Sequence, residues 1–154
     1  MPVRGIQFTQ EQALLAVDIS RETLRHWRKM IPYLAERSGK AARFSFSDLV
    51  ALAITREIIE SFGVSIASVE AGIETLFRVL AAARPGTLQT GVVIMTSATT
   101  KLYRRDQTMK LEHSVATLVV PCETHVLRMR ERVVPGLRLN QQPGLPFLPR
   151  AVRK

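Results

Sequence analysis

Hydrophobic residues recur with a helical period over most of the first 84 positions, and the pattern predicts four helices there. The first follows Thr9, which has capping-box spacing to Gln12, and it ends at Asp18, a residue that tolerates the left-handed conformation of a tight turn. The second follows Ser20, a good N-cap, and runs to about Lys29. Two helices joined by a short turn are therefore expected at the start of the chain.

Two longer helices are expected next. One starts near Ser47 and stops at Gly63, with inward side chains expected at Leu49, Leu52, Ala53, Ile58, Ile59 and Phe62. The other is capped by Ser65 and ends by Pro85. Its apolar seam consists of Ile66, Val69, Ile73, Leu76 and Leu80, broadened by Phe77. This seam either packs against the preceding helix or contacts a second copy of the chain.

The pattern changes after residue 84. Three short strands are predicted at 92–95, 102–105 and 115–120. Residues 121–134 form either a helix, with a loose apolar stripe of Val126, Leu127, Val133 and Val134, or a further strand. Residues 135–154 are rich in proline and are expected to be an extended, flexible basic tail.

The second helix has two different faces. Leu24, Trp27 and Ile31 share one side, which we expect to be buried, because they recur at helical spacing. The opposite side carries the basic and polar residues Arg21, Arg25 and Arg28, flanked by Glu22, His26 and Lys29. Arg25 has an alternative role, pairing with an acid such as Asp48 to brace the helix. An apolar anchor would thus hold a row of cations towards solvent.

A basic segment, residues 33–46, follows this helix. Gly39 lies at its centre, and the alternation from Arg43 to Phe46 predicts a small β-hairpin pinned by Phe44 or Phe46. Arg37, Lys40 and Arg43 would remain exposed. Tyr33 either contacts a phosphate or closes this segment.

Charge favours an anionic partner over other possibilities. The chain has 154 residues, 46% of them hydrophobic, and a net charge of +9 concentrated towards its two ends.

The single Cys122 excludes an intrachain disulfide, and no apolar run is long enough for a membrane span, so we expect a cytoplasmic protein. Cys122, His125 and His113 are too few and too weakly placed to predict a metal site, and no residue grouping has catalytic spacing. We expect neither an enzyme nor a cofactor.

The order of these features resembles the N-terminal domain of the MerR family of bacterial transcription regulators. The matching fragments are Ile19-Ser20-x-x-Thr23-Leu24-Arg25, Arg43-x-Ser45, Asp48-Leu49 and Phe62-Gly63-Val64-Ser65-Ile66, within roughly residues 7–72. The family has tyrosines where this chain has His26 and Trp27. It also continues into a long dimerisation helix, whereas Pro85-Gly86 interrupts that region here.

The resemblance implies a winged helix-turn-helix at residues 6–84. Together with the strands predicted after it, this makes an α+β protein, in which we expect a β-rich assembly or partner-binding segment at 85–134 and the tail at 135–154. The resemblance also implies a sequence-specific, double-stranded-DNA-binding transcription regulator acting as a homodimer, with residues 21–29 in the major groove and 33–46 as a wing. The expected DNA contacts are Ser20, Arg21, Thr23, Arg25, His26, Arg28, Lys29, Arg37, Lys40 and Arg43. Arginine suits guanine, threonine and histidine suit base edges or phosphates, and the wing suits the backbone or minor groove.

Two other functions remain open from the sequence. The module also suits an excisionase-like, architectural DNA-binding factor of a mobile element, which would bend DNA. A protein-interaction adaptor that binds no DNA is the third hypothesis. The operator, the direction of regulation and any small-molecule effector cannot be read from the residues.

Overall fold

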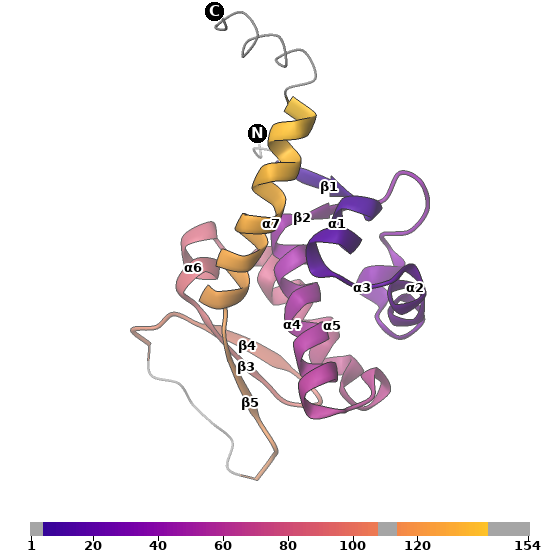
Figure 1. The fold of residues 1–154 in the computed structure, drawn as a ribbon. Helices are drawn as coiled ribbons and strands as arrows, with labels where there is room; N and C mark the ends of the chain where they lie inside the picture. The colour runs from indigo at the N-terminus through magenta and orange to yellow at the C-terminus, as the bar shows by residue number, and fades with distance from the viewer. Residues whose placement is uncertain (1–4, 108–113, 142–154) are drawn as a thin grey trace, which may run out of the picture.

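The computed structural model describes residues 5–107 and 114–141, with only the backbone for 134–141. The chain has an α+β fold in which helices surround two small antiparallel sheets (Figure 1). The N-terminal elements are β1 (Gln7–Thr9), α1 (Gln10–Val17), α2 (Arg21–Met30), α3 (Pro32–Ala35), β2 (Arg43–Ser45), α4 (Phe46–Phe62) and α5 (Ile66–Ala82). They are followed by α6 (Pro85–Thr90), β3 (Val92–Met95), β4 (Thr100–Tyr103), β5 (Leu118–Pro121) and α7 (Glu123–Gln141).

Capping geometry confirms the predicted ends of α1, the start of α2 and the end of α4, whereas Ser65, predicted to cap α5, lies at its N-cap position without a side-chain cap hydrogen bond. The Thr9 hydroxyl accepts from the Gln12 N–H at 3.2 Å, and the Gln12 side chain accepts from the Thr9 N–H at 2.9 Å. Asp18 ends α1 with a φ of 62°, and Gly63 ends α4 with a φ of 64°. Both residues adopt the left-handed conformation that releases a chain from a helix. Local residue chemistry therefore determines where these helices begin and end.

The hairpin predicted inside residues 33–46 is wrong. Residues 32–35 form the short helix α3, and β2 pairs antiparallel with β1, so that Phe8 lies opposite Phe44. Both phenylalanines are buried. Phe46 belongs to α4 instead, because the Ser45 hydroxyl caps that helix. The alternating pattern correctly indicated a strand, but its partner lies more than thirty residues earlier in the chain.

The second sheet has the order β4-β3-β5 and confirms three strands after residue 84. Its inner face packs against the rest of the core through Val93, Met95, Leu102, Leu118 and Val120. The turn between β3 and β4 lies against α5, where the Thr100 hydroxyl donates to the Gly72 carbonyl at 2.7 Å. The C-terminal sheet is therefore joined to the N-terminal helices.

The ambiguous segment after residue 121 is a helix. Helix α7 lies against α1 and α4 and extends past them (Figure 1). Its buried apolar side chains, among the residues whose side chains are described, are Val126, Met129 and Val133, whereas Leu127 is exposed, contrary to the predicted stripe. The helix also includes residues 135–141, which the sequence had assigned to an extended tail; the rest of that tail, 142–154, lies outside the described residues.

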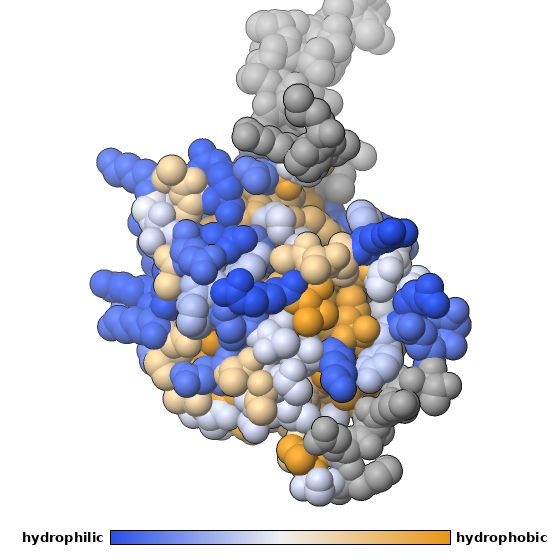
Figure 2. All heavy atoms as spheres, turned by 180° about the vertical axis from the view of Figure 1, so that it is seen from behind, coloured by the Kyte–Doolittle hydropathy of each residue, from blue (hydrophilic) through white to orange (hydrophobic). Residues whose placement is uncertain are grey.

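One hydrophobic core links the two halves of the chain, since the same cluster includes Phe8, Trp27, Phe77, Met95 and Met129. The α5 seam of Ile73, Leu76 and Leu80 is buried within it, whereas Phe62, predicted to point inward, is 61% exposed. Seen from behind, hydrophilic side chains gather on the side of α2 and α3, and hydrophobic surface on the side of α6 and the C-terminal sheet (Figure 2). Within the described ranges, no helix has the length and apolar character needed to cross a bilayer.

Candidate nucleic-acid interface

Helix α2 is held by its apolar side, as predicted. Leu24 and Trp27 are buried in the core, and the Ser20 hydroxyl caps the helix by accepting from the Thr23 N–H at 3.0 Å. Arg25, His26 and Lys29 are exposed on the outward side. Because the buried tryptophan fixes the rotation of the helix, these three side chains must point towards solvent.

Two arginines of α2 have acidic neighbours that partly offset their charge. Arg21 pairs with Glu11 of α1, and Arg25 pairs with Glu22 one turn before it. All four side chains are largely exposed. Arg25 therefore does pair with an acid, as one alternative expected, but the acid is Glu22 rather than Asp48. Exposed ion pairs of this kind contribute only about 0–1 kcal/mol to stability, so both arginines can exchange their carboxylate for another anion at little cost.

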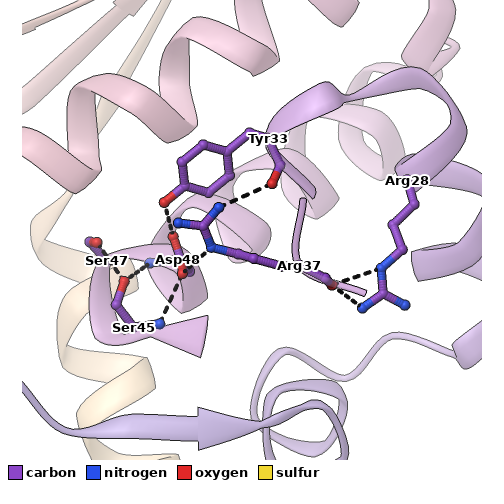
Figure 3. Close-up of polar contacts among 6 residues, drawn as sticks. All are labelled: Arg28, Tyr33, Arg37, Ser45, Ser47 and Asp48. Carbon is purple, nitrogen blue, oxygen red and sulfur yellow. Dashed lines mark hydrogen bonds and ion pairs between the residues drawn. The ribbon is translucent and has the colours of Figure 1, made fainter. Parts of the chain in front are cut away.

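Asp48 is instead the centre of a buried polar cluster between α3, β2 and α4 (Figure 3). Its side chain is 2% exposed and accepts from the Tyr33 hydroxyl at 2.6 Å and from the Ser45 N–H at 2.9 Å. The Arg37 guanidinium lies 3.3 Å from Oδ2, the oxygen that also accepts from the Ser45 N–H, and supplies the compensating charge. A buried carboxylate with several donors is satisfied rather than reactive.

Arg37 also contacts Tyr33, and Arg28 holds Arg37 in turn. The Arg37 guanidinium lies 3.7 Å from the centre of the Tyr33 ring and donates to the Tyr33 carbonyl at 3.1 Å. The Arg28 guanidinium donates twice to the Arg37 carbonyl, at 3.1 and 2.5 Å (Figure 3). Burial raises the pKa of Tyr33, helped by the hydrogen bond to Asp48, and burial lowers the pKa of Arg28.

These bonds give Arg28 and Arg37 a positioning role. Arg28 ties the loop of residues 36–42 to α2, and Arg37 ties the same loop to α4. Both residues were predicted from the sequence as DNA contacts, and Arg37 was expected to be exposed, whereas its side chain is only 28% exposed. Asp48 is the residue in the sequence that could have indicated this positioning role. It lies three residues after Ser45 and forms a capping box with it, so its carboxylate lies at the start of α4.

A groove of about 520 Å³ separates α2 from the loop of residues 36–42. We call it the basic groove; its lining is Thr9, Gln10, Glu11, Arg21, Arg28, Gly39, Lys40 and Arg43. Four of the ten predicted contacts meet there, with one carboxylate among them. Arg43 donates to the Ala42 carbonyl at 2.9 Å, and Lys40 is exposed. Loop and helix thus present cations to one shared space.

The remaining predicted contacts lie elsewhere. Arg25, His26 and Lys29 occupy the outward face of α2, beside the groove, and Arg37 is in the Asp48 cluster. Ser20 and Thr23 line a different cleft, which also contains Trp27 and Arg56. The hydroxyls of Ser20 and Thr23 hydrogen-bond to each other at 2.9 Å, so they define the start of α2.

Two of the three candidate metal ligands, Cys122 and His125, lie within the described residues. Cys122 is buried, and burial raises the pKa of its thiol to about 11, so the thiol stays protonated. His125 is also buried, and its Nε2 lies 2.6 Å from a Glu57 carboxylate oxygen. Over residues 5–107 and 114–141, no three potential metal ligands cluster. His113 lies outside the described residues.

No protein-family model matches this chain, and no curated protein sequence matches it. An inference about function therefore depends on the geometry of the basic groove and of the outward face of α2.

Proposed function

We propose that this protein is a sequence-specific, double-stranded-DNA-binding transcription regulator whose N-terminal half acts as a MerR-like winged helix-turn-helix. In this proposal the outward face of α2 enters the major groove and the loop of residues 36–42 acts as the wing. The protein works as a homodimer in the cytoplasm, on the DNA of the cell. No cofactor is required for this activity.

The observation that carries the proposal is the basic groove beside a helix anchored by Trp27. The groove brings Arg21, Lys40 and Arg43 together from positions far apart in the sequence. Phosphate groups attract such clustered cations, and binding them releases counterions from the DNA. Arg28 ties the loop of residues 36–42 to α2, and the buried Asp48 cluster ties it to α4, so the cations of the loop keep their place beside the helix.

The residues divide into two kinds of contact. Lys40 and Arg43 suit phosphates, which supply affinity and orientation. Arg25, His26 and Lys29 suit base edges, because they project from the side of α2 opposite its buried anchor. When DNA binds, Arg21 would separate from Glu11 and Arg25 from Glu22, because exposed ion pairs contribute little to stability. Two copies would read half-sites about 34 Å, or a multiple of this, apart.

Fluorescence anisotropy with fragments of the source genome tests the proposal at several salt concentrations. We expect one or more fragments to bind about 1,000-fold or more tightly than random DNA. Lys40→Ala and Arg43→Ala should each weaken binding to all sequences and reduce the salt slope by about one. Arg25→Ala should relax sequence preference instead.

The exposed Lys101 of β4 provides a matched control, because it is remote in sequence from the groove and lines no part of it. Lys101→Ala should leave affinity and salt slope unchanged. Binding that never exceeds the affinity for random DNA would refute sequence-specific regulation. If Arg21, Lys40 and Arg43 can all be replaced by alanine without affecting DNA binding, the basic groove is not the interface.

A further inference from the structure

A second groove lies between the two halves of the chain, and its lining is mostly apolar. It occupies about 420 Å³ among the residues before β1, the start of α4, the start of α6 and the middle of α7. We call it the apolar groove; its lining is Gly5, Ile6, Phe8, Ser45, Phe46, Ser47, Ala83, Pro85, Leu88, Arg130 and Val133. None of these residues lines the basic groove.

The groove leaves hydrophobic surface in contact with water. Ile6 is 58% exposed, whereas Phe8 and Leu88 are buried behind it and form the wall. Apolar surface of this kind gains about 25 cal/mol for each square ångström that is covered. Known small-molecule sites have about 300–1,000 Å³ and a mainly hydrophobic lining, so the apolar groove has both the size and the lining of such a site.

Arg130 is the single charged residue in this lining. Its guanidinium donates to the side-chain oxygen of Gln89 at 3.2 Å, a neutral acceptor. Within the described parts of the chain, no carboxylate lies within ion-pair distance of it. The Ser45 and Ser47 hydroxyls, by contrast, already hydrogen-bond to each other at 2.9 Å. One cation with spare donors beside an apolar wall fits a ligand with one anionic end.

We propose that the apolar groove binds a small amphipathic monocarboxylate, with its hydrocarbon body against Ile6, Phe8 and Leu88 and its carboxylate on Arg130. Burial of the hydrocarbon supplies affinity, and the guanidinium fixes the orientation of the ligand. The groove is separate from the basic groove, so this binding does not depend on the proposed DNA-binding function. Its lining combines the cap of α4 with α7, and an occupant would therefore bridge the two halves of the chain.

Isothermal titration of the full chain with three probes tests the proposal. Decanoate has both required features, decanol lacks the charge, and butyrate lacks most of the hydrocarbon. Decanoate, kept below its micelle concentration, should bind at least about tenfold more tightly than decanol, as expected for a charge-assisted hydrogen bond. Butyrate should bind at least about tenfold more weakly than decanoate.

Two substitutions with matched controls locate the site. Arg130→Gln should weaken decanoate about tenfold and leave decanol unchanged. Arg128→Gln, on the same helix but lining a different cleft, should change neither. Ile6→Asp should weaken both probes, whereas Leu15→Asp, at an even more exposed apolar position outside the groove, should weaken neither.

Each part of the proposal has a titration result that would contradict it. Failure of decanoate to bind the folded full chain would overturn the proposal. Equal affinity for decanoate and decanol would refute the role of Arg130. Binding that survives Ile6→Asp unchanged would place the ligand outside the apolar groove and would equally overturn the assignment.

Discussion

At the scale of single residues, a buried carboxylate organises the surface that we propose contacts DNA. Asp48 caps α4, accepts from Tyr33 and holds Arg37, so one side chain connects three segments. Removing one partner of a buried, hydrogen-bonded charge usually costs more than the pair itself contributes. Asp48 should therefore be sensitive even to a nearly isosteric change.

Asp48→Asn tests this role. The variant keeps an acceptor for Tyr33 but loses the charge that holds Arg37, so we expect the free energy of unfolding to fall by about 1–3 kcal/mol. The measurement is urea unfolding followed by circular dichroism. Asp106→Asn serves as the control, because Asp106 forms an exposed pair with Arg104 and should change stability by less than about 0.5 kcal/mol. Equal effects of the two substitutions would contradict the role of Asp48.

The sequence predicted which residues of α2 are buried but not the roles of all its arginines. Leu24 and Trp27 were assigned correctly, because burial follows from helical periodicity. Arg28 and Arg37 were predicted to contact DNA, and the structure adds contacts within the protein: Arg28 with the Arg37 carbonyl and Arg37 with Asp48. Periodicity shows which side of a helix a residue occupies, whereas its bonding partner depends on a loop whose path the pattern does not specify.

At the scale of elements, the same division appears between local and non-local information. The ends of α1 and α4 were predicted within one or two residues, because Thr9, Asp18 and Gly63 act on their own neighbours. The pairing of β1 with β2 was missed, because two short strands far apart in sequence carry no mark of their register. The residue pattern did not predict the close contact between α5 and the β3–β4 turn either.

Gly72 makes that contact testable. A Cβ there would overlap the Thr96 carbonyl oxygen and would lie 3.2 Å from Cγ of Met95. Alanine favours a helix over glycine by about 1 kcal/mol, but a backbone oxygen cannot move aside cheaply. We expect Gly72→Ala to lower the free energy of unfolding by about 1–3 kcal/mol in urea.

Gly86 of α6 is the matched control for this substitution, because a Cβ there meets no atom within 4 Å. Gly86→Ala should leave stability unchanged or raise it by up to about 1 kcal/mol. If Gly72→Ala were as stable as the parent protein, the β3–β4 turn would not pack against α5 as described.

At the scale of the whole molecule, α7 joins the C-terminal half to the N-terminal helices. Arg132 donates to the Ala16 carbonyl of α1 at 2.8 Å, and His125 contacts Glu57 of α4. The sequence left residues 121–134 undecided between helix and strand, because alternating apolar and basic residues fit both periods. Packing against α1 and α4 selects the helix, and this information lies in those distant elements rather than in the segment itself.

The burial of His125 beside Glu57 makes the attachment of α7 depend on pH. Burial lowers the pKa of His125, as does Arg128, while Glu57 opposes them, and the Nδ1 atom of His125 has no hydrogen-bond partner within the described structure. The unfolded chain therefore takes up a proton first as the pH falls below about 6.5, so acid favours unfolding. We expect the free energy of unfolding in urea to decrease from pH 7.5 to 5.5, with this residue contributing at most about 1.4 kcal/mol per pH unit.

His125→Gln should be less stable at pH 7.5 but should lose part of this pH dependence, whereas His26→Gln, at an exposed position of α2, should retain it. An unchanged pH dependence in His125→Gln would show that some other group controls the acid sensitivity, and α7 would then be held chiefly by the apolar packing of Val126, Met129 and Val133.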